Sequence, residues 1–374
     1  LNEARINDGA APYFATITKD AGTNWQDALF NYNALVQSHQ VNLEGGSDKV
    51  NYYLSFGYLG QDGIVGGNYN RSNFKRYSAR VKNAYKVFEA KDRNWLKRLN
   101  ILANVAYSRT ESTGIAENSA FYSPLGSALL LDPTMPVYAQ DPEAVLAKYP
   151  TAVKDKNGRV YSVPDITMNE IINPLANLEL PGGKTYTDRL TANVQAELEI
   201  YTDLKFKTAF NGDLTINNYE NYSYPFYLSS GGAGNSSTSS VNQSLSRSWT
   251  WQVENTLSYQ HNFSGHTVGA LIGQSASKTT YTYVSGTAYD LPTYDPYKAV
   301  IDYAQGSQEE QQAGGSRSYT ANASYFVRLN YDYKERYLFQ TSLRVDGSDK
   351  FGPNNRWGVF PSFSLGWNVA KEDF

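Results

Sequence analysis

The sequence contains no cysteine and only 2 methionines among its 374 residues. Without cysteine the chain has no disulfide framework, no thiolate nucleophile and no thiolate-bound metal. It also lacks an apolar run of about 18 residues, so no stretch of it is predicted as a transmembrane helix. A membrane protein is not thereby excluded, because a transmembrane barrel strand exposes only one face to lipid and its hydropathy averages to that of a soluble sequence.

The sequence also lacks clusters of like charge. The net charge is −3, and no block of like charges indicates an acidic or basic tail. Nucleic acid is therefore not expected as a partner, since binding it requires a clustered basic surface. The first residues, LNEARINDG, have neither a charged start nor an apolar core, and we expect any targeting segment to be missing or removed.

What the sequence has in abundance is alternation of apolar and polar residues, together with 31 tyrosines. In residues 189–200, RLTANVQAELEI, apolar side chains occupy every second position. In residues 321–333, ANASYFVRLNYDY, only Phe326 interrupts the polar row. Strict alternation is typical of strands with one apolar and one polar face. It predicts roughly eleven strands, near residues 36–45, 48–60, 71–85, 97–110, 184–199, 203–217, 244–261, 266–285, 316–333, 336–346 and 356–369.

Many of these strands exceed the usual globular length of about 5–6 residues and reach the roughly 9–11 residues that a tilted membrane crossing needs. Helices are a minor component. We expect short ones at Thr23–Phe30 and at Asp141–Tyr149, where Asp141 is placed as N-cap and Pro142 as the first helical residue.

The connections between strands alternate in length. Short turns are predicted at 45–49, 201–203, 262–265 and 333–336, with a somewhat longer one at 87–96. Long connections lie between them, at 59–70, 111–183, 219–240 and 286–315. Structureless loops of that length are improbable in a compact soluble domain. The pattern is typical of an antiparallel transmembrane β-barrel with short periplasmic turns and long extracellular loops, of which 111–183 is the longest.

The run DGSDKFGPNNRWG, residues 346–358, places Asp and Asn oxygens among glycines. It lacks the ligand spacing of an EF-hand loop, although Asp346, Ser348 and Asp349 leave a cation site open as an alternative. By the alternation of connections this reversal belongs to the extracellular rim. Aromatic residues at the strand ends indicate girdles at the membrane interfaces, with cross-strand packing as the alternative: Tyr58, Tyr107, Tyr259, Tyr331, Tyr333, Tyr337 and Trp367.

Three stretches resemble one family. GGSDKVNYYLSFGYLGQDGIV (45–65) and NYDYKERYLFQTSLRVDGSDKFGPNNRWGVFPSFSLGW (330–367) resemble barrel segments of SusC/RagA-type TonB-dependent transporters of Bacteroidetes outer membranes. NWQDALF (24–30) is similar to the family's run just before the first of these segments. Spacing and order agree, and the resemblance spans the whole chain, with only a loose match in the long loops.

The resemblance implies a barrel of roughly 22 strands around a plug domain. It also implies a SusD-like surface lipoprotein as a lid, oligosaccharide or oligopeptide cargo, and uptake energised by TonB. The chain has about half of these strands and no plug, so we expect residues 1–374 to be part of a larger barrel in the bacterial outer membrane, in contact with its lipid. Residues before Phe374 form no apolar stripe, and the terminal Phe is interpreted as accidental.

Transport of this kind makes no covalent bond, and no cofactor or metal is expected. Aromatic loop residues are candidates for stacking on sugars or packing on peptides, and polar rows for lining the lumen. The alternative for any one tyrosine is that it holds the loops together or contacts the lid. The candidate substrate-binding residues are Tyr122, Tyr138, Tyr222, Tyr224, Tyr227, Arg328, Asp332, Arg344 and Asp346.

Enzymatic activity is not expected. The sequence has three histidines, His39, His261 and His266, all interpreted as lying near the periplasmic end, away from surface substrates. The latter two flank the turn at 262–265 without a carboxylate or third imidazole at ligand spacing. The alternative function is a soluble or surface-anchored β-rich protein that binds carbohydrate or mediates adhesion, though no short repeat of a solenoid is visible. A passive porin differs only in having no plug.

Overall fold

The structure is a computed structural model that describes residues 2–11, 22–115, 121–165, 168, 170–232 and 234–372. Phe374, whose position we interpreted above, lies outside these residues. The chain divides into two compact units. One comprises residues 1–32, 115–180 and 225–237, and is called the loop unit below. The other comprises residues 33–114, 181–224 and 238–374, and is called the sheet unit.

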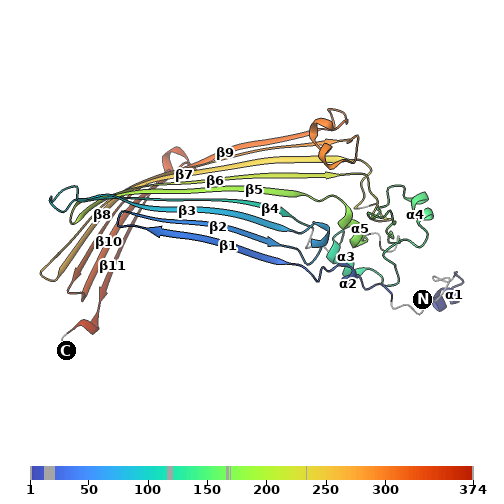
Figure 1. Cartoon of the computed structure of the whole chain (residues 1–374), viewed down its shortest axis with the longest axis horizontal. Helices are drawn as coiled ribbons and strands as arrows, with labels where there is room; N and C mark the ends of the chain where they lie inside the picture. The colour runs from blue at the N-terminus through green and yellow to red at the C-terminus, as the bar shows by residue number, and fades with distance from the viewer. Residues whose placement is uncertain are drawn as a thin grey trace. The chain divides into compact units, whose positions relative to one another are not determined.

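The sheet unit is a single antiparallel sheet whose eleven strands follow one another in sequence order (Figure 1). Each strand pairs with the next along the chain, as in a meander. The prediction of roughly eleven alternating strands is confirmed. The strands are β1 (Val36–Gly46), β2 (Val50–Gln61), β3 (Phe74–Glu89), β4 (Arg98–Thr113), β5 (Lys184–Tyr201), β6 (Leu204–Ser223), β7 (Ser240–Phe263), β8 (His266–Tyr289), β9 (Gln312–Tyr333), β10 (Tyr337–Ser348) and β11 (Trp357–Trp367).

The sheet is open. In the described part of the chain β1 pairs only with β2, and β11 pairs only with β10. The strands from β6 to β9 are 20 to 24 residues long, several residues longer than predicted. The outer ends of β6 and β7, residues 218–223 and 240–243, carry Asn and Ser without clear alternation, and they continue the ladder because the two strands pair with each other there.

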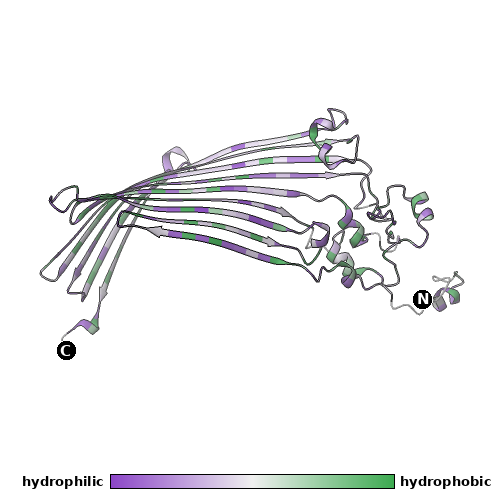
Figure 2. Ribbon diagram, viewed as in Figure 1, coloured by the Kyte–Doolittle hydropathy of each residue, from purple (hydrophilic) through white to green (hydrophobic). Residues whose placement is uncertain are grey.

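The register carries each face of the sheet from strand to strand. Figure 2 shows hydrophobic and hydrophilic residues following one another along the strands. Directly paired residues of antiparallel strands point to the same side. On one side Val194 pairs with Ala103 and Phe210, and this apolar face continues across the sheet. On the other side Asn193 pairs with Asn104 and Asn211, which begins a continuous polar face. The two predicted faces are therefore both present.

The connections alternate as predicted. The connections at one end, mostly short, span 47–49, 90–97, 202–203, 264–265 and 334–336, and those at the other, mostly long, span 62–73, 114–183, 224–239, 290–311 and 349–356; between the two ends only 90–97 and 349–356 are equal in length. Antiparallel order puts the first group at one end of the strands and the second group at the other. Ser264 and Gly265 both have positive φ, as the two-residue hairpin turn between β7 and β8 requires.

Short helices and 3₁₀ turns occur before, between and after the strands. Both predicted helices form: α2 (Trp25–Leu29) is capped by Asn24, and α4 (Pro142–Lys148) by Asp141. In the described residues no helix is long and apolar enough to cross a membrane. The remaining elements are α1 (Asn2–Asn7), α3 (Pro124–Leu130), α5 (Pro174–Glu179), η1 (Gly67–Tyr69), η3 (Pro296–Lys298), η4 (Ile301–Tyr303), η5 (Pro353–Asn355) and η6 (Val369–Lys371).

Helices α2, α3 and α5 pack on one another and form the core of the loop unit. Trp25, Leu29, Ile172 and Leu178 are almost fully buried there. Asn173 fixes this core to the chain around it. Its side-chain amide donates to the carbonyls of Val137 and Ser162, and its oxygen accepts from the first two amides of α5. Helix α5 is therefore held by its cap as well as by its apolar face.

Replacing Asn173 with Ala should destabilise the loop unit by about 3 kcal/mol, since the helix loses its cap and two buried carbonyls lose their donor. Asp141→Ala is the matched control, because that exposed cap accepts a single hydrogen bond, from the Ala144 amide, and its loss costs about 1 kcal/mol. Hydrogen exchange of the α5 and α4 amides measures both. Equal losses in the two variants would contradict the structural role assigned to Asn173.

Candidate functional site

The polar face of the sheet is organised by side-chain pairs that bridge neighbouring strands. Arg189 on β5 forms an ion pair with Asp213 on β6, with 2.7 Å between Nη2 and Oδ2. Arg80 on β3 donates to the Asn104 side chain on β4 at 2.9 Å. Alternation predicts that such residues share a face, but the pairing depends on register. The face presents polar and charged groups to whatever lies opposite it.

The four predicted lumen residues lie on this face but do not form one cluster. Arg344 donates through Nε to both carboxylate oxygens of Asp346, at 2.7 and 2.9 Å, so the structure brings these two together near the long-connection end. Asp332 lies at the short-connection end, where it accepts from the Glu335 amide at 2.8 Å. Arg328 lies between them and pairs with Ser342 in the register.

Phe326 is the one aromatic side chain that interrupts the polar row in β9, and the structure shows how it fits there. Its ring lies against Gly273 on β8, where any β-carbon would overlap the ring. The Arg344 guanidinium lies over the same ring, 5.3 Å from the centroid. The glycine thus provides the space and the arginine a cation–π contact.

The predicted rim run forms one wall of a shallow cleft of about 450 Å³ between β9, β10 and β11. Asp346 in this cleft is neutralised by Arg344. Among the described residues no three His, Cys, Asp or Glu side chains are placed to hold a metal ion together. The reversal at 349–356 lies at the long-connection end, as predicted.

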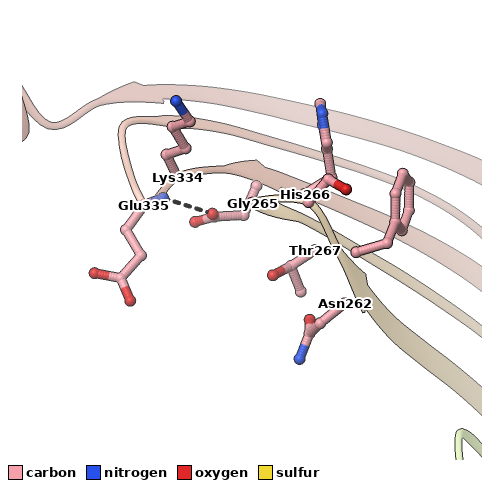
Figure 3. Close-up of a pocket in the computed structure, with 9 residues that line it drawn as sticks. Asn262, Gly265, His266, Thr267, Lys334 and Glu335 are labelled. Carbon is pink, nitrogen blue, oxygen red and sulfur yellow. Dashed lines mark hydrogen bonds between the residues drawn. The ribbon is translucent and has the colours of Figure 1, made fainter.

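The histidines are arranged differently from expectation. His261 and His266 lie at the short-connection end, where Nδ1 of His261 is 2.8 Å from Asp203 and Nδ1 of His266 is 2.8 Å from the Tyr331 hydroxyl. His266 and Asn262 both line a surface hollow of about 440 Å³ beside the turns 264–265 and 334–336. Figure 3 shows their side chains pointing in opposite directions. His39 was wrongly assigned to this end. It pairs with Tyr58 near the long connection 62–73, because β1 runs toward the short turn.

A large cleft of about 1140 Å³ lies wholly within the loop unit. Both methionines of the chain, Met135 and Met168, line it. Tyr149 and Tyr227 lie at one side with their rings stacked, 4.1 Å between centroids. Asp132, Asp141, Lys148 and Asp165 add charged groups to the lining. Adaptable thioethers, aromatic rings and charges suit a ligand of mixed polarity.

The five predicted tyrosines divide between the two units. Tyr227 lines the large cleft. Tyr122 lies in the same unit, with a positive φ of 57° and its ring against Gly234. Tyr138 stacks on Tyr161 and carries the Arg159 guanidinium over its ring at 3.9 Å. Both rings of that stack are therefore held within the loop unit.

Tyr222 and Tyr224 belong to the sheet unit. They pack against a small core of Val241, Ala288, Leu291 and Ala299 beneath the connection 290–311. Burial raises the pKa of Tyr224 to about 12, so its hydroxyl stays protonated. The register pairs Tyr222 with Val241, which places it on the apolar side of the sheet. A substrate-binding role for any of the five tyrosines stays a prediction.

A buried carboxylate orders the turn beside Tyr138. Asp155 accepts from the amides of Asn157 and Arg159, both at 2.9 Å, and from the Arg159 guanidinium. Burial alone would raise the pKa of Asp155, but these hydrogen bonds and the positive charge hold it below its ordinary value. The carboxylate thereby positions Arg159 over Tyr138, although sequence analysis had not singled it out.

An open antiparallel sheet with one apolar and one polar face, and with short and long connections at opposite ends, defines part of a transmembrane β-barrel. The family described as TonB dependent receptor-like, beta-barrel, matches residues 146–373, which is more than half of the chain. The chain therefore belongs to the TonB-dependent receptor β-barrel family.

Particular relatives agree with this assignment. The chain is 31% identical to the TonB-dependent receptor SusC of Bacteroides thetaiotaomicron, over 95% of this chain and 33% of SusC. It is 26% identical to the TonB-dependent receptor P3 of Formosa agariphila, over 95% of this chain and 32% of P3. The chain thus spans about a third of the length of these curated relatives. The resemblance to SusC-type receptors is confirmed.

A solved structure of the RagAB peptide transporter superposes with a TM-score of 0.72 over 92% of this chain and 35% of that chain, at 18% identity. The RagAB peptide importer in its open-open state gives the same TM-score over 97% of this chain and 37% of that chain, at 19% identity. At this level of identity the likeness shows the fold alone, and that fold is the one predicted.

Replacing Asp155 with Asn should speed local hydrogen exchange at residues 155–159 roughly 30-fold, because about 2 kcal/mol of charge-assisted hydrogen bonding is lost. A lowered pKa stabilises the turn fully above the unfolded value of about 3.9 and progressively less as the pH falls through the folded value. The difference between the two proteins should therefore shrink below about pH 4. Lys156→Gln, in the same turn, should leave exchange unchanged. A difference that persists in acid would contradict the role of the charge.

Proposed function

We propose that this chain forms part of the barrel of a bacterial outer-membrane importer that takes up oligosaccharides or oligopeptides. In this proposal residues 1–374 contribute eleven strands of a larger barrel that also encloses a plug domain. The connection 114–183, within the predicted extracellular loop 111–183, faces the outside. A SusD-like lipoprotein covers the mouth, TonB supplies the energy through another part of the protein, and no covalent chemistry takes place.

The single observation that carries the proposal is the open sheet with two chemically distinct faces. Hydrocarbon tolerates neither unpaired strand edges nor exposed backbone groups, so an apolar face of this size requires the sheet to be closed by further strands. The polar face then lines a lumen, with Arg328, Asp332, Arg344 and Asp346 at different depths. Family membership and the fold of RagA support the same placement.

The large cleft of the loop unit is the proposed cargo site on the outer side. It offers Tyr227, the methionines and a charged lining to one ligand. Tyr122 and Tyr138 support the loop around it, while Tyr222 and Tyr224 hold the connection 290–311. Cargo captured there passes to the polar face of the barrel when the plug moves. Sugar rings stack on aromatic faces and peptides pack on apolar ones, so both cargo classes suit the cleft.

Membrane orientation can be tested on two adjacent residues. Val194 on β5 faces lipid in this proposal, and Gln195 faces the lumen. In the full-length protein Val194→Arg should cost about 2–4 kcal/mol of folding free energy in bilayers, and Gln195→Arg about 0–1 kcal/mol. Denaturant titration of the folded barrel in vesicles measures both. Equal costs for the two substitutions would rule out a lipid-facing Val194.

Uptake tests the function itself. A strain without the gene should fail to remove one mixture, of oligosaccharides or of oligopeptides, from the growth medium. The full-length gene should restore removal of that mixture. Tyr227→Ala should raise the apparent KM roughly three- to tenfold through loss of an aromatic contact. Tyr32→Ala is the control, because this exposed tyrosine of the same unit does not line the cleft.

The outcomes separate the two parts of the proposal. Depletion that continues without the gene, or that persists after the TonB complex is removed, would overturn the importer. If the Tyr227→Ala gene restores uptake with an unchanged KM, the importer function is supported, but the cleft is not its cargo site. Binding of soluble glycan by an undocked, membrane-free protein would favour the adhesion alternative instead.

A further inference from the structure

Three basic residues lie together on the apolar side of the sheet, toward the long-connection end. Arg247 on β7 and Arg317 on β9 both pair with Thr282 on β8, so all three side chains share one face. Lys278, also on β8, pairs with Trp251 and Ala321 on that face. Positive charges on a lipid-facing surface are costly in the hydrocarbon and need an explanation.

Their depth places them at the outer interface. In β9 the lipid-facing aromatic residues Tyr319 and Tyr331 are separated by 12 residues. A strand that rises about 3.3 Å per residue and tilts by about 40° covers roughly 30 Å of depth over that length, close to an apolar band of about 25 Å between aromatic girdles. Tyr331 lies near the short turn, so Tyr319 marks the outer girdle, and Arg317 lies just beyond it.

Lys278 reaches toward the same level. Lys278 pairs with Ala321, which lies two residues from Tyr319 toward the short-connection end of β9. The ammonium nitrogen of Lys278 lies over the Tyr319 ring, 5.0 Å from the centroid. A lysine that extends its stem along apolar surface toward the interface is a snorkelling residue. Trp249, which pairs with Thr280 beside Tyr319, supplies a second aromatic residue at this level. The cluster therefore combines aromatic rings with converging positive charges.

Within the described residues, the charges of this cluster have no acidic partner, since none of Arg247, Lys278 and Arg317 forms an ion pair there. The contrast is Arg109 on β4, which lies on the same side of the sheet and pairs with Asp188 at 3.4 Å and Glu111 at 3.7 Å. By register, Glu220 lies two paired rows above Arg247 on the same face, and the amide of Asp349 donates to the Ala321 carbonyl.

We propose that Arg247, Lys278 and Arg317, with Trp249 and Tyr319, bind the phosphate group of a phosphorylated glycolipid in the outer leaflet. Arginines on strands β7 and β9 stand two strand spacings apart, roughly 10 Å, and flank the headgroup, while Lys278 contacts it from below. Acyl chains lie along the apolar residues of β8 and β9 beneath the cluster, such as Ala276, Ala323 and Val327. Unpaired cations at an interface are the complement of anionic lipid headgroups.

The inference rests on the proposed location in the outer membrane and adds a defined lipid site to it. Its test uses the full-length protein, washed free of lipid in detergent, and titrated with monophosphoryl lipid A. Native mass spectrometry measures bound lipid. Each charge contributes about fivefold, so Arg247→Gln, Lys278→Gln and Arg317→Gln together should weaken binding on the order of 100-fold. Lipid A from which the phosphate has been removed should bind both proteins equally weakly.

The matched control removes three positive charges from the opposite face: Arg76→Gln, Arg80→Gln and Lys82→Gln on β3, which should leave lipid binding unchanged. Equal loss in the control, or undiminished binding in the lipid-face variant, would overturn the proposal. If the lipid-face triple variant does not insert, the three single variants decide, since each is expected to weaken binding about fivefold. Uptake is scored separately, so an unaltered protein that transports cargo but binds no monophosphoryl lipid A would overturn this site alone.

Discussion

Backbone pairing between neighbouring strands is the constraint on which the rest of the structure depends. Each strand from β2 to β10 pairs with a neighbour on both sides, although β9 pairs with β10 only over residues 322–333, and the outer edges of β1 and β11 have no partner in the described part of the chain. Because paired residues share a face, the register fixes simultaneously the apolar surface, the polar surface and the positions where charges meet. Loops and candidate sites are consequences of that ladder.

Much of this ladder could be predicted because alternation is a local signal. Rows such as Leu190, Ala192 and Val194 identify a strand without knowledge of its neighbours. The outer ends of β7 and β8 could not be predicted in the same way, because their order comes from pairing and from the core under 290–311. Helices α3 and α5 were missed although Ser123–Pro124 and Asn173–Pro174 carry the cap signal used correctly at Asp141–Pro142. Their segment was predicted as an irregular loop because its hydrophobic residues do not repeat at helical spacing over a long enough stretch.

The candidate site was less predictable than the fold. Tyr222, at the end of β6, and Tyr227, in the connection that follows, are five residues apart in sequence, yet one packs against the connection 290–311 and the other lines the cleft. No local pattern separates them, since the difference arises from contacts with segments far away in sequence. The cleft itself joins Met135 to Met168 and Tyr227, and the basic cluster joins three strands. Alternation assigns each residue to a face, whereas register and loop packing decide its neighbours.

The close approach of Phe326 to Gly273 has a consequence for the history of this sequence. A ring on the polar face of β9 is possible only while the facing position on β8 has no side chain, and Arg344 has its aromatic partner only while the ring remains. If Gly273 were replaced first, the new β-carbon would overlap the Phe326 ring. If Phe326 were replaced first by a smaller residue, position 273 could accept almost any side chain. The permitted order of substitution at these two sites is therefore one-directional, and descendants that keep the phenylalanine should also keep the glycine.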